Sequence, residues 1–145
     1  MFTIVDVVTS LRAAVEAVTP THAVGADDTF RTQVTSDDAV RGTRAVTITA
    51  TGPVPLRPGR SCYEWRSTLS LTVWHRMTGT SDDGELSVYE RALLDSELIA
   101  AAVQAWAGVT NGITQHEMSE ADIAPNGDGW LLTERTIAVQ YTRGT

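Results

Sequence analysis

The sequence predicts an α+β domain in which two helices cover one face of an antiparallel sheet of about four strands, in the order α-β-β-α-β-β. Residues 63–77 alternate between apolar and polar side chains, which is the period of a half-buried strand. Residues 4–18 and 88–106 repeat apolar side chains at the spacing of helices. Residues 113–141 carry a strong turn signal between two strand-like stretches. These three patterns together predict the fold class.

Composition predicts one domain, residues 1–145, with a core of its own: 42% of the residues are hydrophobic and 20% are charged. The single cysteine, Cys62, excludes an internal disulfide and favours an intracellular place of assembly. No apolar run approaches the roughly 20 residues of a membrane span, so we expect no membrane partner. The net charge of −7 disfavours nonspecific binding of nucleic acid.

The first third of the chain predicts one helix and one clear strand. In residues 4–18 the apolar side chains form one stripe, Thr3 and Asp6 form the N-terminal cap, and Pro20 ends the helix. Residues 21–42 carry weak signals, with a possible short strand at 30–34, and we expect a loop that is mobile or ordered by a partner. Residues 43–51 form a strand whose outer face is coated with threonine.

Residues 52–62, GPVPLRPGRSC, contain three prolines and two glycines, which exclude regular structure. Two interpretations remain open. The segment is either a wide hairpin loop or a basic arm in which Arg57 and Arg60 reach a neighbouring subunit. In both interpretations it is mobile, or it is ordered only by a partner.

The strand at 63–77 is unusually long, about 50 Å at roughly 3.3 Å per residue, so it must twist, bend or project past its own core. Its apolar face includes Leu69, Leu71 and Val73. Trp74 falls on the opposite, polar face, where a large aromatic side chain needs a cover. This residue predicts contact with another chain.

The second helix begins at a capping box formed by Ser87 and Glu90 and spans residues 88–106, with Gly108 expected as its end. It is apolar on more than one side, so we expect it to be covered on more than one side. A final hairpin follows, with strands at 113–123 and 130–141 and a turn at 124–129. Trp130 and Leu132 fall on the face opposite the apolar side of the last strand.

Catalytic and metal-binding patterns are missing from the sequence. His22, His75 and His116 lie on different elements without ligand spacing, and Cys62 has no CxxC or nearby histidine. No phosphate loop, nucleophile elbow or dinucleotide fingerprint occurs. We therefore expect no enzyme, no metal and no cofactor. Trp74 and Trp130, with Arg57 and Arg60, are the candidate interface residues. For Trp130, a second small core under a loop is an equal alternative.

The chain resembles the tail-terminator, or tail-completion, proteins of tailed bacteriophages. The resemblance rests on element order, length and local sequence: the strand LSLTVWHRM, a polar loop, the helix LLDSELIAAAVQAW, the turn NGDG and the last strand LLTERTIAVQYT. It covers the first helix and most of the chain from Arg44 onward.

The resemblance implies a virion protein of the head–tail junction, assembled in the host cytoplasm and without catalytic activity. Six copies form a ring that caps the tail tube, stops its polymerisation and contacts the head connector. DNA passes through the centre without specific binding. Two alternatives remain open. One is another head–tail joining or tube-related protein, and the other is a cytosolic α+β ligand-binding domain with its cleft between helices and sheet.

Overall fold

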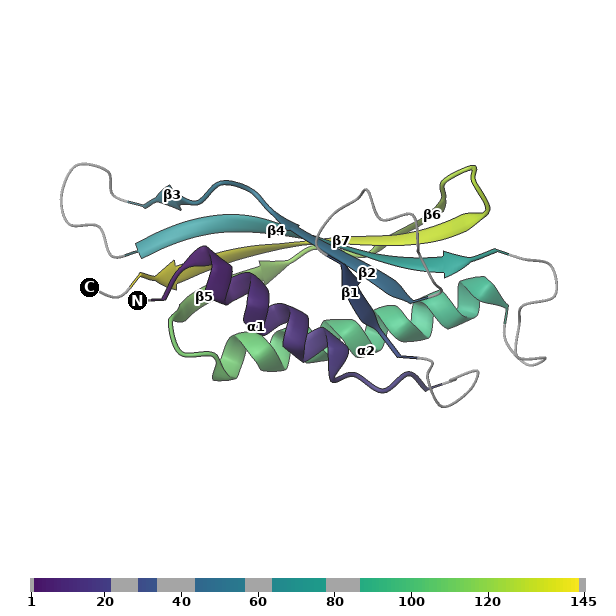
Figure 1. The fold of residues 1–145 in the computed structure, drawn as a ribbon, viewed down its shortest axis with the longest axis horizontal. Helices are drawn as coiled ribbons and strands as arrows, with labels where there is room; N and C mark the ends of the chain where they lie inside the picture. The colour runs from purple at the N-terminus through teal and green to yellow at the C-terminus, as the bar shows by residue number, and fades with distance from the viewer. Residues whose placement is uncertain (1, 22–28, 34–43, 57–63, 78–86, 144–145) are drawn as a thin grey trace.

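The protein, seen in a computed structural model, is described at residues 2–21, 29–33, 44–56, 64–77 and 87–143 (Figure 1). Two helices and seven strands follow one another along the chain: α1 (Ile4–Glu16), β1 (Arg31–Gln33), β2 (Ala45–Ala50), β3 (Val54–Pro55), β4 (Glu64–Arg76), α2 (Val88–Val109), β5 (Ile113–Met118), β6 (Asp122–Pro125) and β7 (Trp130–Thr142).

The predicted fold class was wrong. The protein has a mixed α/β fold with a seven-stranded mixed sheet, not an antiparallel sheet of about four strands in the order α-β-β-α-β-β. The main path through the sheet is β1-β2-β4-β7-β5, while β3 pairs with β4 and β6 pairs with β7. The β1–β2 pair is parallel, and the other pairs are antiparallel.

Two of the extra strands, β3 and β6, arise because β4 and β7 are longer than their neighbours. Each has 13 residues, whereas β2 and β5 have six. The first part of β4 therefore pairs with β3, and the first part of β7 pairs with β6. Strands of two to four residues are too short to show a period of two. The prolines of residues 52–62 thus did not exclude all regular structure, and the expected strand at 113–123 is two strands.

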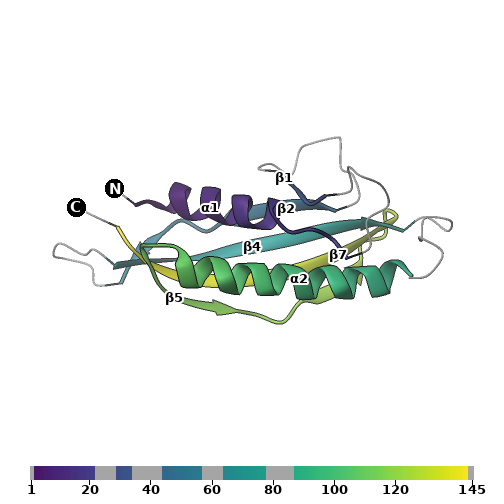
Figure 2. The ribbon, with the colours of Figure 1, turned by 90° about the horizontal axis from the view of Figure 1, so that it is seen from below.

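Both helices lie on one face of the sheet, where the core is formed (Figures 1 and 2). From α1 come Val7, Leu11 and Val15, and from α2 come Ile99, Val103 and Trp106. The sheet contributes alternate residues of its central strands: Val46, Ile48, Leu69, Leu71, Val73, Ile137, Val139 and Tyr141. The Trp106 Nε1–H donates to Ser10 Oγ over 2.8 Å and fixes α2 against α1.

Both predicted helix starts are confirmed. Thr3 with Asp6, and Ser87 with Glu90, form capping boxes in which side chain and backbone bond reciprocally. The predicted end of α2 at Gly108 was wrong, because Gly108 is helical and the helix continues to Val109. Thr110 ends it, with both its N–H and its hydroxyl donating to the Trp106 carbonyl.

By length and composition alone, α2 is apolar enough to cross a membrane. Core helices of compact domains have the same composition, and α2 packs on the sheet through its buried face. This single helix is therefore weak evidence for a membrane, and the core that it forms is the better explanation.

Gly112 provides a test of the turn that follows α2. Its φ is +104°, and a Cβ at this position would lie 2.7 Å from the Phe2 ring. We expect Gly112→Ala to lower the free energy of unfolding by about 1–3 kcal/mol through backbone strain and displacement of Phe2. Urea denaturation measures this change in the free energy of unfolding. The matched control is Gly108→Ala, where a Cβ meets nothing within 4 Å, and this variant should be stabilised by roughly 0.5–1 kcal/mol. Equal stability of the two variants would contradict this account.

Candidate functional site

The two tryptophans that the sequence marked as interface residues lie together on the open face of the sheet, opposite the helices. The antiparallel register places Trp74 across from Leu132 and Arg76 across from Trp130. Because side chains alternate along a strand, all four side chains share the open face. We call Trp74, Arg76, Trp130 and Leu132 the aromatic patch.

The geometry of the aromatic patch is well defined. The rings of Trp74 and Trp130 meet edge to face, with centroids 6.0 Å apart and planes at 82°. The Trp74 Nε1–H donates to Thr47 Oγ1 over 3.2 Å, and the Arg76 guanidinium lies 5.4 Å from the Trp130 ring centroid. Both indoles and Leu132 are half-buried, so part of this apolar surface contacts solvent.

The turn before β7 fixes Trp130 in this position. The Asn126 Oδ1 accepts hydrogen bonds from the backbone N–H groups of Asp128 and Trp130, and the Asn126 N–H donates to the Trp130 carbonyl. Gly127 and Gly129 adopt positive φ, which glycine reaches without strain. Asn126 and these two glycines therefore set the position at which β7 starts, and with it the face on which Trp130 lies.

The other two candidate interface residues, Arg57 and Arg60, lie outside the described residues. Among the described elements, no helix lies on the face that carries the aromatic patch (Figure 1). Whether a neighbouring subunit or another segment of the same chain meets the patch stays a prediction.

A buried polar cluster, formed by Arg44, His75 and Asp95, lies between α2 and the sheet. All three side chains are at most 2% exposed. The Asp95 Oδ2 accepts from Arg44 Nε at 2.8 Å and lies 2.7 Å from His75 Nε2. Arg44 has a φ of +67°, and its guanidinium also lies 5.9 Å from the Phe30 ring centroid. The cluster is closed to solvent, so it has the features of a structural link and not of a reaction site.

The environment of Asp95 favours its charged form. Burial raises the pKa of this carboxyl, but hydrogen bonds from His75 and Arg44, together with the positive charge of Arg44, outweigh it. The net effect lowers the pKa of Asp95 below its ordinary value. Asp95 therefore links β4 and the residue preceding β2 to α2 as an anion.

Sequence reasoning missed this cluster, although two signals pointed to it. His75 falls on the apolar face of β4, two residues after Val73, and Asp95 falls four residues before Ile99 on the buried face of α2. A charged side chain on a buried face implies a buried partner. The partner itself was not predictable, because Arg44 precedes β2 and reaches the cluster only through the fold.

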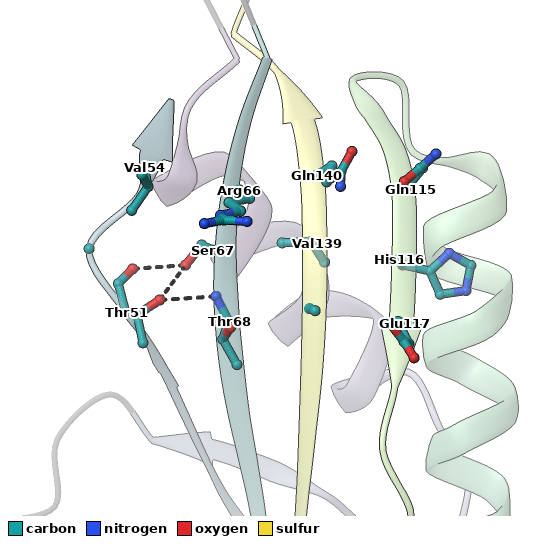
Figure 3. A pocket seen from close by; sticks show the side chains of 12 residues that line it. Thr51, Val54, Arg66, Ser67, Thr68, Gln115, His116, Glu117, Val139 and Gln140 are labelled. Atoms are coloured by element: carbon teal, nitrogen blue, oxygen red, sulfur yellow. Dashed lines mark hydrogen bonds between the residues drawn. The ribbon is translucent and has the colours of Figure 1, made fainter. Parts of the chain in front are cut away.

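The open face of the sheet also carries a hollow of about 800 Å³ between β3 and β5 (Figure 3). It crosses β4 and β7, and its lining includes Arg66, Thr68, Gln115, Glu117 and Gln140. On its β2 side, Thr51 Oγ1 accepts from the Thr68 N–H over 3.0 Å. The hollow is wide and mixes polar with apolar side chains, such as Val54 and Ala138. His116 and Glu117, as adjacent strand residues, point to opposite faces (Figure 3). Among the described residues that line the hollow, no acid and base are aimed at one point.

Metal binding has no support in the part of the chain that the structure describes. Within it, no group of three or more His, Cys, Asp or Glu side chains is placed to hold a metal ion. His22 and Cys62 lie outside that part.

No protein-family model matches the chain, and no curated protein matches it in sequence.

Asp95→Asn tests the buried polar cluster. Removing the anion takes the Asp95 charge away from two buried side chains, Arg44 and His75, and we expect the free energy of unfolding at pH 7 to fall by about 3–5 kcal/mol. Denaturant titrations at several pH values measure it. Glu97→Gln, on the exposed face of the same helix, is the matched control and should change stability by less than about 0.5 kcal/mol.

The same titrations test the sign of the pH dependence. The pKa of Asp95 is lowered in the folded protein. Its contribution to the free energy of unfolding is therefore fully present above the ordinary aspartate pKa of about 3.9. The contribution is lost as the pH falls through the folded value. The difference in the free energy of unfolding between the parent protein and Asp95→Asn should therefore become smaller as the pH falls. A difference that grows below pH 4 would contradict the charged link.

Proposed function

We propose that this chain is a structural protein of the phage tail-terminator type, which assembles into a ring of copies at the head–tail junction. The ring caps the tail tube, stops its polymerisation and contacts the head connector. The observation that carries the proposal is the aromatic patch, a solvent-contacting apolar surface on the open face of the sheet. The resemblance of the sequence to phage tail-terminator proteins also supports the proposal.

A ring of identical copies needs heterologous interfaces, in which one surface of each copy meets a different surface of the next. The aromatic patch supplies one such surface. Aromatic and arginine side chains are enriched where interfaces derive most of their binding energy, and Trp74, Trp130 and Arg76 are of these types. The long β4–β7 pair supports these side chains on two hydrogen-bonded strands, not on a loop.

The charge of the chain is compatible with a ring through which DNA passes. With a net charge of −7, the protein has no excess of cations to neutralise phosphates. DNA in the lumen of such a ring would meet repulsion and not adhesion.

Of the two alternatives, only the ligand-binding domain has less support. Another head–tail joining or tube-related protein uses the same kind of interface, so the aromatic patch does not separate it from a terminator. The ligand-binding alternative expects a cleft between the helices and the sheet of this chain. Core side chains from both layers occupy that space. In the hollow on the open face, the polar groups of the described lining residues do not converge.

The oligomeric state tests the proposal. Light scattering across a range of concentrations should give a mass near six chains of 15.6 kDa, or a monomer that forms rings when assembled tail tubes are added. Electron microscopy of the tubes should then show a ring at one end. A concentration-independent monomer or dimer that leaves tubes unchanged would contradict it.

Trp74→Ala tests the role of the aromatic patch. The indole is half-buried, so we expect the monomer to lose only about 1–2 kcal/mol of stability and to remain folded. Assembly should weaken at least tenfold, as read from light scattering. Thr49→Ala, which removes an exposed side chain from β2 on the same face, should assemble normally. If Trp74→Ala unfolds outright, Trp74 belongs to the core and the interface argument is lost.

A further inference from the structure

The strand β1 lies at the outer margin of the sheet beside β2 and is weakly paired (Figure 2). Three residue pairs join it to β2, from Arg31 opposite Ala45 to Gln33 opposite Thr47, and they form the parallel pair of an otherwise antiparallel sheet. Parallel pairing is slightly weaker per residue, and the ordering of three residues opposes the few hydrogen bonds that they gain. Pairing with β2 alone therefore does not account for the position of β1.

Two side chains on the helix side of the sheet add to the attachment of β1. Phe30, which precedes the strand, is 1% exposed and belongs to the hydrophobic core. Thr32 contacts α1, because its hydroxyl accepts from Arg12 Nε over 3.1 Å and donates to Glu16. The Thr32 N–H also donates to Glu16 Oε1 over 3.3 Å. One buried ring and one polar contact with α1 therefore anchor the strand.

Arg44 connects β1 to the buried polar cluster. Its carbonyl accepts from the Arg31 N–H over 3.2 Å, and its own N–H donates to the Trp74 carbonyl over 2.7 Å. Its guanidinium lies over the Phe30 ring and bonds to Asp95. The φ of +67° lies in the left-handed region, which is unfavourable for arginine and persists only where surrounding contacts hold it. The bond to Asp95 therefore holds Arg44, and with it the contacts to β1, in a strained conformation.

The edge that β1 covers is the outer edge of β2, along its first three residues. The Thr51 N–H donates to the Thr68 carbonyl on β4, so by alternation the N–H groups of Val46 and Ile48 point away from β4. An uncovered strand edge is a template to which a strand of another chain adds. Without β1, the edge at Val46 and the site of Phe30 in the core would both be exposed.

We propose that β1 is a strap that closes the β2 edge against strand addition by a second copy, and that it opens as a unit before the rest of the fold unfolds. Arg44 is its latch. When the strap opens, the Arg44 carbonyl loses the Arg31 N–H, and Arg44 leaves the left-handed region. The relief of strain then offsets part of the packing that Phe30 loses. The inference goes beyond the proposed ring and does not depend on it, because the strap guards this edge in a monomer as well as in a ring.

Amide hydrogen exchange of the parent protein, followed by NMR at several low concentrations of urea, tests the local opening. We expect the N–H groups of β1 to exchange at least about 100-fold faster than those of Leu71 and Ile137, after correction for intrinsic rates. Leu71 and Ile137 lie on strands that are paired on both sides. Exchange in β1 should depend little on urea, because opening of the strap exposes little surface.

Two variants separate opening of the strap from simple exposure and from global unfolding. Phe30→Leu weakens the anchor and should accelerate exchange of all β1 amides by one common factor, since they open together. Gly112→Ala, the matched control, acts at the turn after α2 and should accelerate exchange of Leu71 and Ile137 while leaving β1 unchanged. Equal protection of β1 and the central strands, no response of β1 to Phe30→Leu, or equal acceleration of both groups by Gly112→Ala would each overturn the inference.

A disulfide that locks the strap tests its guarding role. In a Cys62→Ser background, Arg31→Cys and Ala45→Cys place two thiols on Cα partners of the β1–β2 pair, a separation that a disulfide spans. Oxidised and reduced protein are each held equally far below their own melting temperature, so that a difference in global stability does not decide the result. Light scattering then follows growth beyond the starting oligomer.

We expect the reduced protein to associate at least about tenfold faster than the oxidised protein, because only its β2 edge becomes uncovered. Cys62→Ser alone, with and without reductant, is the control and should show no difference. Equal rates of the oxidised and reduced double variant would overturn the guarding role. The presence or absence of a ring in the starting protein leaves this comparison unchanged, so the strap and the proposed function fail separately.

Discussion

The pairing of β4 with β7 is the constraint on which the rest of the structure depends. Thirteen consecutive residue pairs join the two strands, from Glu64 opposite Thr142 to Arg76 opposite Trp130. A slip of one residue would exchange the two faces of a strand, because side chains alternate. The register that buries Leu69 against Ile137 is therefore the same register that places Trp74 beside Leu132 on the open face. Core and aromatic patch are set together, and neither can shift without the other.

The β4–β7 pair is so long that the sheet needs a contact with α2 beyond the part that α1 covers. The buried polar cluster supplies this contact. Figure 1 shows that α1 covers only part of the sheet, while α2 continues along it. Where α1 no longer contributes, the sheet presents His75 and α2 presents Asp95, with Arg44 completing the charge balance. A buried ion pair adds little net stability compared with apolar packing, but its geometry is specific. The cluster therefore adds a specific contact between α2 and the sheet to the apolar packing.

The sequence predicted those parts of the fold that have a clear period. The long strand, both helices, both capping boxes and the turn before Trp130 follow from local patterns. The total strand number and the parallel β1–β2 pair do not, because strands of two to four residues are too short to show a period. The faces of Trp74 and Trp130 were predictable from alternation. Their mutual contact required the β4–β7 register, and Arg44 reached Asp95 only through tertiary structure.

The charge of the chain opposes the association that its apolar surfaces favour. Copies that each carry −7 repel one another, and this repulsion acts over the Debye length, about 10 Å at 0.1 M salt. A contact between copies must therefore gain enough from apolar burial to exceed it, with Arg76 offsetting part of the acidic charge locally. In the proposed ring every copy buries its aromatic patch against a neighbour, and no patch remains exposed at an end. Under that proposal, repulsion between isolated copies favours assembly on a template such as the end of a tube over association in free solution.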